Sequence, residues 1–115
     1  MTIDEIRENQ KIIDNLKKTI ERKEKLDKLY ENELFKEVIL EGYLRVELDK
    51  LISLQNYFAV NATPSTVSFA DQQDKLTQKQ IEAIGLFKYF LDTVKKQGRE
   101  AEESLKEIEN SNNQM

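Results

Sequence analysis

The first quarter of the chain carries apolar residues at a seven-residue spacing, which predicts a helix with one narrow seam. Between Thr2 and about Tyr30, isoleucine recurs at positions 6, 13 and 20, and leucine stands three residues after the second of these. Apolar residues at heptad positions a and d form the contact of a coiled coil. We therefore expect residues 1–31 to be a polar helical arm whose coiled-coil seam is Ile6, Ile13, Leu16 and Ile20. The seam would be either an apolar stripe on a solvated helical arm or a contact between subunits. In the second case the polar Asn9 would help to set the register.

The stretch FKEVILEGYLRVELDKL, from Phe35 to Leu51, is apolar almost all the way round an α-helix. At 100° per residue its apolar residues form two stripes roughly 140° apart, and one neighbouring helix cannot cover both. We therefore expect the helix at about 32–58 to be enclosed on two sides, by a helix that folds back and by other subunits. The residues expected to contact a partner are Phe35, Ile39, Leu40, Gly42, Tyr43, Leu44, Val46, Leu48 and Leu51, together with Tyr89.

Gly42 lies in the middle of this apolar stretch, where glycine costs about 1 kcal/mol relative to alanine. It marks either a tolerated defect or break in the helix, or a close approach of another backbone. The residues alone leave both readings open.

The rest of the chain predicts a loop and a second helix. The only proline, Pro64, lies among Asn, Thr and Ser, which favours a turn within a loop at 59–74. Thr77 and Gln80 then match a capping box at the start of a helix, and one apolar stripe continues from Ala83 to Ile108. We expect this helix at 75–109 and a disordered tail at 111–115.

Together these segments predict an all-α protein: a long helical hairpin at 32–110, preceded by a partly coiled-coil N-terminal arm, and oligomeric. Charged residues make up 35% of the 115 residues and there are only three glycines and one proline. This composition is typical of long amphipathic helices.

Composition also narrows the possible chemistry. The chain contains neither cysteine nor histidine, so it lacks thiolate metal ligands, the commonest general base and the commonest transition-metal ligand. We expect no enzymatic activity, no catalytic or metal site and no cofactor. The N-terminus is charged from its fourth residue, unlike a signal peptide, and no apolar run approaches the roughly 20 residues that span a membrane.

Two clusters of charged residues could bind a ligand. Glu33, Glu37 and Glu41 share a helix face but are better explained as ordinary surface residues, with Glu33–Lys36 and Glu41–Arg45 as ion pairs. Seven basic and four acidic residues between positions 11 and 28 give the arm a local charge of +3, which could contact phosphates. Because the signs are interleaved, and the net charge of the chain is −4, nucleic-acid binding is the weaker interpretation.

Two stretches resemble small all-helical structural and assembly proteins of tailed bacteriophages. The first is an F-x-x-V-I-x-x-G-Y pattern, from Phe35 to Tyr43. The second is A-I-G followed by an aromatic pair, from Ala83 to Phe90. The resemblance covers about residues 33–103, and it implies a phage origin, a role in the particle or its assembly, and no catalytic residues.

We therefore expect a non-enzymatic helical interaction or assembly protein, a minor structural or assembly component of a tailed phage particle. Its partner would be a second copy of itself or a larger phage structural protein, in the virion or the host cytoplasm, and not a membrane. Two alternatives remain open. One is a nucleic-acid-associated accessory protein that binds through the Lys-rich arm. The other is a helical oligomer that sequesters a small ligand between subunits, near Tyr43, Arg45 and Tyr89.

Overall fold

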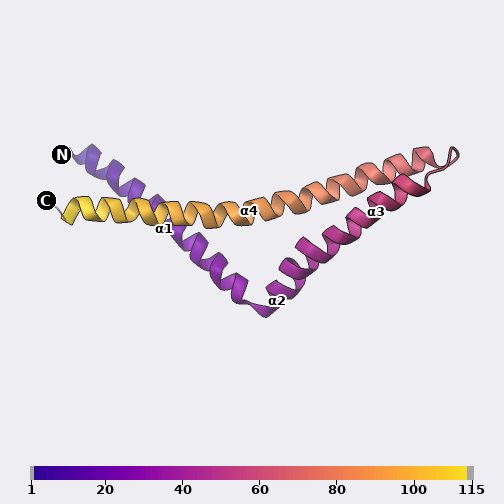
Figure 1. Ribbon diagram of the computed structural model, residues 1–115. Coiled ribbons are helices and arrows are strands. Elements are labelled where there is room, and N and C mark those ends of the chain that lie inside the picture. The colour runs from indigo at the N-terminus through magenta and orange to yellow at the C-terminus, as the bar shows by residue number, and fades with distance from the viewer. Residues whose placement is uncertain (1, 114–115) are drawn as a thin grey trace. The chain divides into compact units, whose positions relative to one another are not determined.

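The computed structural model describes residues 2–113, and the chain is helical along almost all of that range (Figure 1). Its elements are α1 (Ile3–Glu31), α2 (Glu33–Phe35), the π-helix η1 (Lys36–Glu47), α3 (Leu48–Asn61) and α4 (Val67–Asn113). Residues 2–113 contain no strand. The predicted all-α class is confirmed.

The chain forms two compact units. The first, here the terminal unit, contains residues 1–30 and 91–115; the second, the hairpin unit, contains residues 31–90. In the hairpin unit, the Tyr43 ring lies against Phe87 and the Gln55 side chain donates a hydrogen bond to Gln78. Tyr43 precedes Gln55 in the sequence, but its partner Phe87 follows Gln78, so the two segments are antiparallel. The predicted helical hairpin is therefore confirmed.

The first break in the helices falls at Asn32. This residue has extended backbone angles, φ −74° and ψ 124°, and its side chain accepts a hydrogen bond from the Phe35 backbone N–H at 3.0 Å. Asparagine is a preferred N-cap because its side chain satisfies a backbone donor that the first helical turn leaves free. Asn32 therefore separates α1 from α2.

The predicted loop at 59–74 is wrong, because only Ala62–Thr66 separates α3 from α4. Thr63 and Thr66 cap the turn reciprocally: the Thr63 N–H donates to Thr66 Oγ1, and the Thr66 N–H donates to the Thr63 carbonyl, both at 2.9 Å. Pro64 lies in this turn, three residues before α4 begins at Val67, where its missing N–H leaves no helical hydrogen bond unmade. The proline therefore introduces α4 instead of extending a loop.

The predicted capping box at Thr77 is also wrong. Thr77 is buried in the interior of α4, and its hydroxyl donates to the Gln73 carbonyl at 2.8 Å. A threonine hydroxyl can make this bond within a helix as readily as it caps one. At the other end, α4 continues to Asn113, so residues 111–113 of the predicted tail are helical. Gln114 and Met115 lie outside the described residues.

One heptad repeat organises the buried face of α4. Its a positions are Ala70, Thr77, Ile84, Leu91 and Gly98, and all five are buried. Val94 and Ala101 are buried d positions of the same repeat. A strict seven-residue repeat keeps one seam facing its neighbour along a long helix.

The π-helix η1 explains why the stretch around Gly42 is apolar nearly all round an α-helix. A π-helix has hydrogen bonds from i to i+5 and about 4.4 residues per turn. At that period six of these apolar residues fall within one arc of roughly 115°, whereas Val38 and Val46 lie outside it and are 61% and 50% exposed. The residues in this arc, all half-buried, are Phe35, Ile39, Leu40, Tyr43, Leu44 and Leu48. One neighbouring helix can therefore cover these six residues, and cover on a second side stays a prediction.

Four of the five charged residues of η1 occupy the other side of the π-helix, whereas Glu47 is half-buried. Lys36, Glu37, Glu41 and Arg45 are all exposed. Glu33 pairs with Lys36 at 3.3 Å, and Arg45 pairs with Glu41, as the sequence predicted. The π-helical period thus gives this segment one apolar and one charged face.

Gly42 and Gly85 differ in the space around the position of a Cβ atom, although a helix propensity scale treats them alike. A Cβ on Gly42 would lie 3.0 Å from the carbonyl oxygen of Glu37, whereas a Cβ on Gly85 would meet no atom within 4 Å. Gly85→Ala should therefore raise the free energy of unfolding by about 0.5–1 kcal/mol. Gly42→Ala should gain nothing or lower it, because the contact is with a backbone atom that cannot turn aside.

Urea unfolding followed by circular dichroism would measure both variants. Gly85→Ala is the matched control, since it makes the same chemical change in a helix of the same unit. Equal stabilisation by the two substitutions would contradict the π-helical geometry at Gly42.

Candidate interaction surface

All ten predicted contact residues belong to the hairpin unit, and seven of them are half-buried. Leu51 is buried, and the Tyr43 ring meets the Phe87 ring edge to face with centroids 6.0 Å apart. Tyr43 and Leu51 also line a small cavity with Ile84. The return helix α4 therefore covers much of the surface that the sequence assigned to a partner.

Two predicted contact residues remain open to solvent. Val46 is 50% exposed and Tyr89 is 71% exposed. Gly42 is half-buried within η1. Whether Val46 or Tyr89 contacts a partner stays a prediction.

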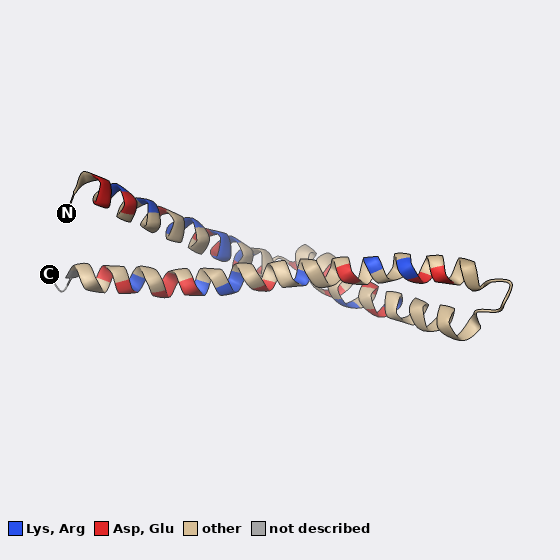
Figure 2. Cartoon of the chain, turned by 90° about the horizontal axis from the view of Figure 1, so that it is seen from above, with Lys and Arg blue, Asp and Glu red and all other residues tan. Residues whose placement is uncertain are grey.

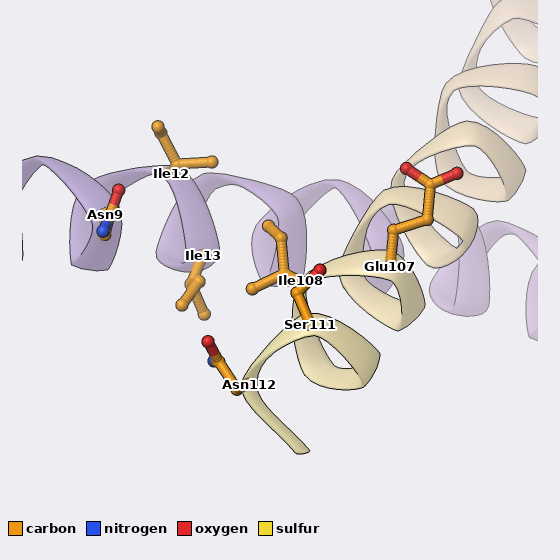
Figure 3. Close-up of a pocket in the computed structure, with 7 residues that line it drawn as sticks. All are labelled: Asn9, Ile12, Ile13, Glu107, Ile108, Ser111 and Asn112. Atoms are coloured by element: carbon orange, nitrogen blue, oxygen red, sulfur yellow. The ribbon is translucent and has the colours of Figure 1, made fainter. Parts of the chain in front are cut away.

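The predicted coiled-coil seam lies in the terminal unit. Ile13, Leu16 and Ile20 are half-buried, whereas Ile6 is exposed. Ile13 shares a groove of about 480 Å³ with Ile108 of α4, and Figure 3 shows these side chains with those of Asn9 and Asn112. At this point the seam meets α4 of its own chain.

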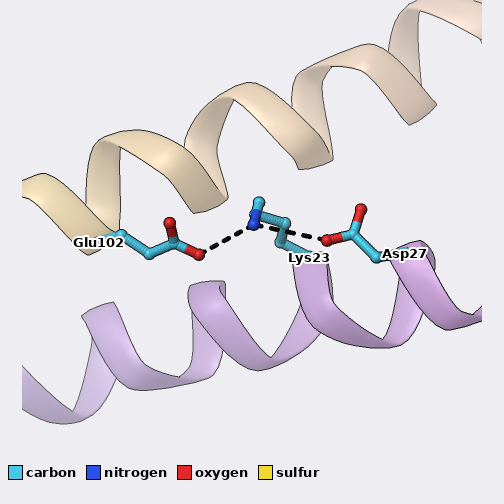
Figure 4. A network of polar contacts seen from close by, with 3 residues as sticks. All are labelled: Lys23, Asp27 and Glu102. Carbon is cyan, nitrogen blue, oxygen red and sulfur yellow. Dashed lines mark hydrogen bonds and ion pairs between the residues drawn. The ribbon is translucent and has the colours of Figure 1, made fainter.

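Lys23 fills the place that Gly98 leaves free. A Cβ on Gly98 would overlap the Cβ and Cγ of Lys23, so only glycine admits the lysine stem here. The Lys23 ammonium then reaches Glu102 at 2.9 Å and Asp27 at 3.4 Å, as Figure 4 shows. The lysine side chain is only 18% exposed. A position that looks polar in the heptad thus becomes a specific contact between α1 and α4.

Lys11, another lysine of the Lys-rich arm, also lies close to a carboxylate. The arm carries both signs interleaved along α1 (Figure 2), and its Lys23 is occupied by two carboxylates. Lys11 is paired with Glu8 at 3.7 Å. Such pairing is typical of the exposed faces of helical bundles.

Tyr30 extends the contact toward the end of α1. The Lys95 ammonium lies 3.6 Å from the centre of the Tyr30 ring, in the geometry of a cation–π interaction. Burial raises the pKa of the Tyr30 hydroxyl, and the negative charge of Asp92 raises it further. Tyr30, Lys95 and Asp92 therefore form a second link within the terminal unit.

One edge of the hairpin unit is apolar, a feature that the sequence analysis missed. Immediately before four a positions of α4 stand Phe69, Leu76, Ala83 and Phe90, and all four are exposed. The three large side chains keep 61%, 53% and 56% of their surface. Because they also recur every seven residues, they form a stripe that runs beside the buried seam.

Helix α3 contributes to the same edge. Tyr57 lines a cavity of about 190 Å³ together with Phe69, and Leu54, three residues earlier, follows it on the same side of α3. Both are exposed. The apolar edge is therefore defined by Leu54, Tyr57, Phe69, Leu76, Ala83 and Phe90.

The opposite edge of the hairpin is polar. Asp71 and Asp74 line a separate cavity with Ala59, and Gln78 and Lys88 are exposed further along α4. The difference between the two edges could have been found in the sequence, because Phe69, Leu76, Ala83 and Phe90 repeat at seven residues. The predicted loop at 59–74 concealed the first of them.

No protein-family model, no curated protein and no solved structure matches the chain. Across residues 2–113, no helix combines the length and apolar character needed to cross a bilayer. The same residues contain no group of three acidic side chains placed to hold a metal ion. The candidate site is the apolar edge, because its large apolar side chains are aligned and exposed.

Gly98→Ala should lower the free energy of unfolding by about 1–3 kcal/mol, because the added methyl overpacks the contact with Lys23. In a Lys23→Ala background the same substitution should cost much less, since the obstructing stem is gone. A double-mutant cycle by urea unfolding measures the coupling. Additive effects of the two substitutions would show that the glycine does not accommodate Lys23.

Raising the pH above about 10 should weaken the terminal unit. The hydrogen bond to Glu102 raises the Lys23 pKa, burial lowers it, and the charges of Glu102 and Asp27 raise it further. Burial raises the Tyr30 pKa, and the negative charge of Asp92 raises it further. Each group holds its proton more tightly in the folded chain than in the unfolded chain. The stability it contributes is therefore complete below the unfolded pKa and is lost as pH rises through the folded pKa.

Unfolding free energies measured between neutral pH and about pH 11 would test this linkage. The double variant Tyr30→Phe/Lys23→Met should show a shallower loss of stability on the alkaline side. An unchanged slope in that variant would assign the alkaline loss to other groups.

Proposed function

We propose that this protein is a non-enzymatic interaction protein that uses the apolar edge of its hairpin to bind a protein surface within a larger assembly. One observation carries the proposal: Phe69, Leu76 and Phe90 are each more than half exposed on one stripe of α4. Single exposed apolar residues are normal on protein surfaces, but aligned ones mark contact sites. A second helix supplies Tyr57 and Leu54 to the same edge.

Helical geometry favours another helix as the bound element. A stripe with a seven-residue period matches the packing of knobs from a facing helix into holes. An extended peptide would need exposed strand edges, and the hairpin unit is helical throughout its described elements. The partner surface is therefore helical and apolar.

The setting we propose is the particle or the assembly pathway of a tailed bacteriophage. Its support is the resemblance carried by Phe35, Gly42 and Tyr43 and by the segment from Ala83 to Phe90. In the structure both stretches belong to the hairpin unit, and the Tyr43 and Phe87 rings are in contact. Eight of the ten resembling positions lie in the covered face or the apolar edge of the hairpin, whereas Val38 and Gly85 are exposed outside both.

Replacing two residues of the apolar edge should abolish either dye binding or self-association, whichever the wild type shows. If the edge is free, it binds an environment-sensitive dye such as ANS; if it is covered by association, light scattering gives a mass above the 13.5 kDa of one chain. Leu76→Gln/Phe90→Gln should lose whichever property the wild type has, because two of the three large side chains of the stripe become polar.

Leu34→Gln/Val38→Gln is the matched control, since both side chains are more exposed than Leu76 and Phe90 and neither belongs to the apolar edge. The control should behave as the wild type in both measurements. A wild-type protein that is monomeric and binds no dye would refute the proposed function.

A further inference from the structure

Three residues of the apolar stripe of α4, Leu76, Ala83 and Phe90, are symmetric in position about Ala83. Leu76 and Phe90 stand seven residues on either side of Ala83, each about 10.5 Å away along the helix. Antiparallel pairing of two such helices about Ala83 would place Leu76 of each copy opposite Phe90 of the other. This part of the stripe, with a large residue on either side of a small one, is therefore complementary to itself, whereas Phe69 would lie opposite Gln97 of the other copy.

Ala83 also permits the close approach that such pairing needs. It is exposed in the structure, and its methyl group lets two helix backbones come nearer than larger side chains would. Isologous interfaces, in which the same patch meets its own copy across a two-fold axis, are the commonest way in which soluble proteins associate. The symmetry of the stripe and the symmetry of such a dimer are the same.

The exposed area is sufficient for this contact. The exposed parts of three aromatic and two leucine side chains on the edge amount to roughly 500 Å² per copy, given about 150–250 Å² for a whole aromatic side chain. Two copies would bury at most about 1,000 Å², the lower limit of specific interfaces. The expected association is therefore weak and depends on concentration.

We infer that the apolar edge is covered by the apolar edge of a second copy, with the two α4 helices antiparallel and crossing at Ala83. This inference rests on the proposed function and names its partner. The two hairpins would then form a four-helix arrangement in which the polar edges, with Asp71 and Asp74, face solvent.

The absence of cysteine allows a clean positional test. Ala83→Cys would place two thiols next to each other at the two-fold axis, whereas Lys88→Cys places an exposed thiol on the opposite edge of the same helix. With a short bis-maleimide at tens of micromolar protein, Ala83→Cys should form covalent dimers about tenfold faster or more, because association raises the effective thiol concentration.

Light scattering on the unmodified protein completes the experiment. The mass should approach twice 13.5 kDa as concentration rises, and Leu76→Gln/Phe90→Gln should stay at the mass of one chain. Equal cross-linking rates for the two cysteine variants would overturn the inferred pairing, even if the protein is dimeric.

The same measurements separate this inference from the proposed function. A wild type that stays monomeric, yet binds dye in a manner lost in Leu76→Gln/Phe90→Gln, would overturn the second-copy inference and leave another helical protein as the partner. A wild type that stays monomeric and binds no dye would overturn both.

Discussion

The seven-residue repeat of α4 is the constraint on which the structure depends. Its seam supplies the buried residues Ile84 and Leu91 near the middle of the helix, and smaller residues such as Ala70 and Ala101 toward its ends. A helix of 47 residues can keep one face covered over its whole length only if the apolar period stays close to 3.5 residues. Both units draw their core from this one repeat.

Residue size along that seam decides how each partner segment fits. At Gly98 the missing side chain admits the stem of Lys23, and the lysine ammonium then finds Glu102 and Asp27. At Ile84, by contrast, a large side chain is almost completely buried. The terminal unit is therefore held by a polar group whose stem is packed and whose charge is paired, a combination that is costly to disturb from either side.

In the hairpin unit, the helix type adapts to the apolar pattern. An α-helix would split the apolar residues from Phe35 to Leu48 into two stripes, whereas the π-helix η1 unites six of them into one that faces inward. A π-helix is rare because its geometry is less favourable than that of an α-helix. Packing of Tyr43 and its neighbours is the compensating gain, and Gly42 is compatible with the backbone approach that results. The surface left over is the apolar edge, whose stripe adjoins the same seam.

The sequence alone determined that the chain is helical, that Ile13, Leu16 and Ile20 form a seam, and that the chain returns on itself after Pro64. These features follow from local rules: heptad spacing, few breakers, and one proline among turn residues. Helix α4 begins earlier than predicted because Thr63 and Thr66 cap the turn, a pairing that the more familiar motif at Thr77 obscured. Only the tertiary structure decided the phase of the segment around Gly42, since the same apolar residues fit two helix periods and packing against α4 selects between them. It also decided which apolar residues are covered, because burial depends on the neighbour that a residue meets and not on the residue itself.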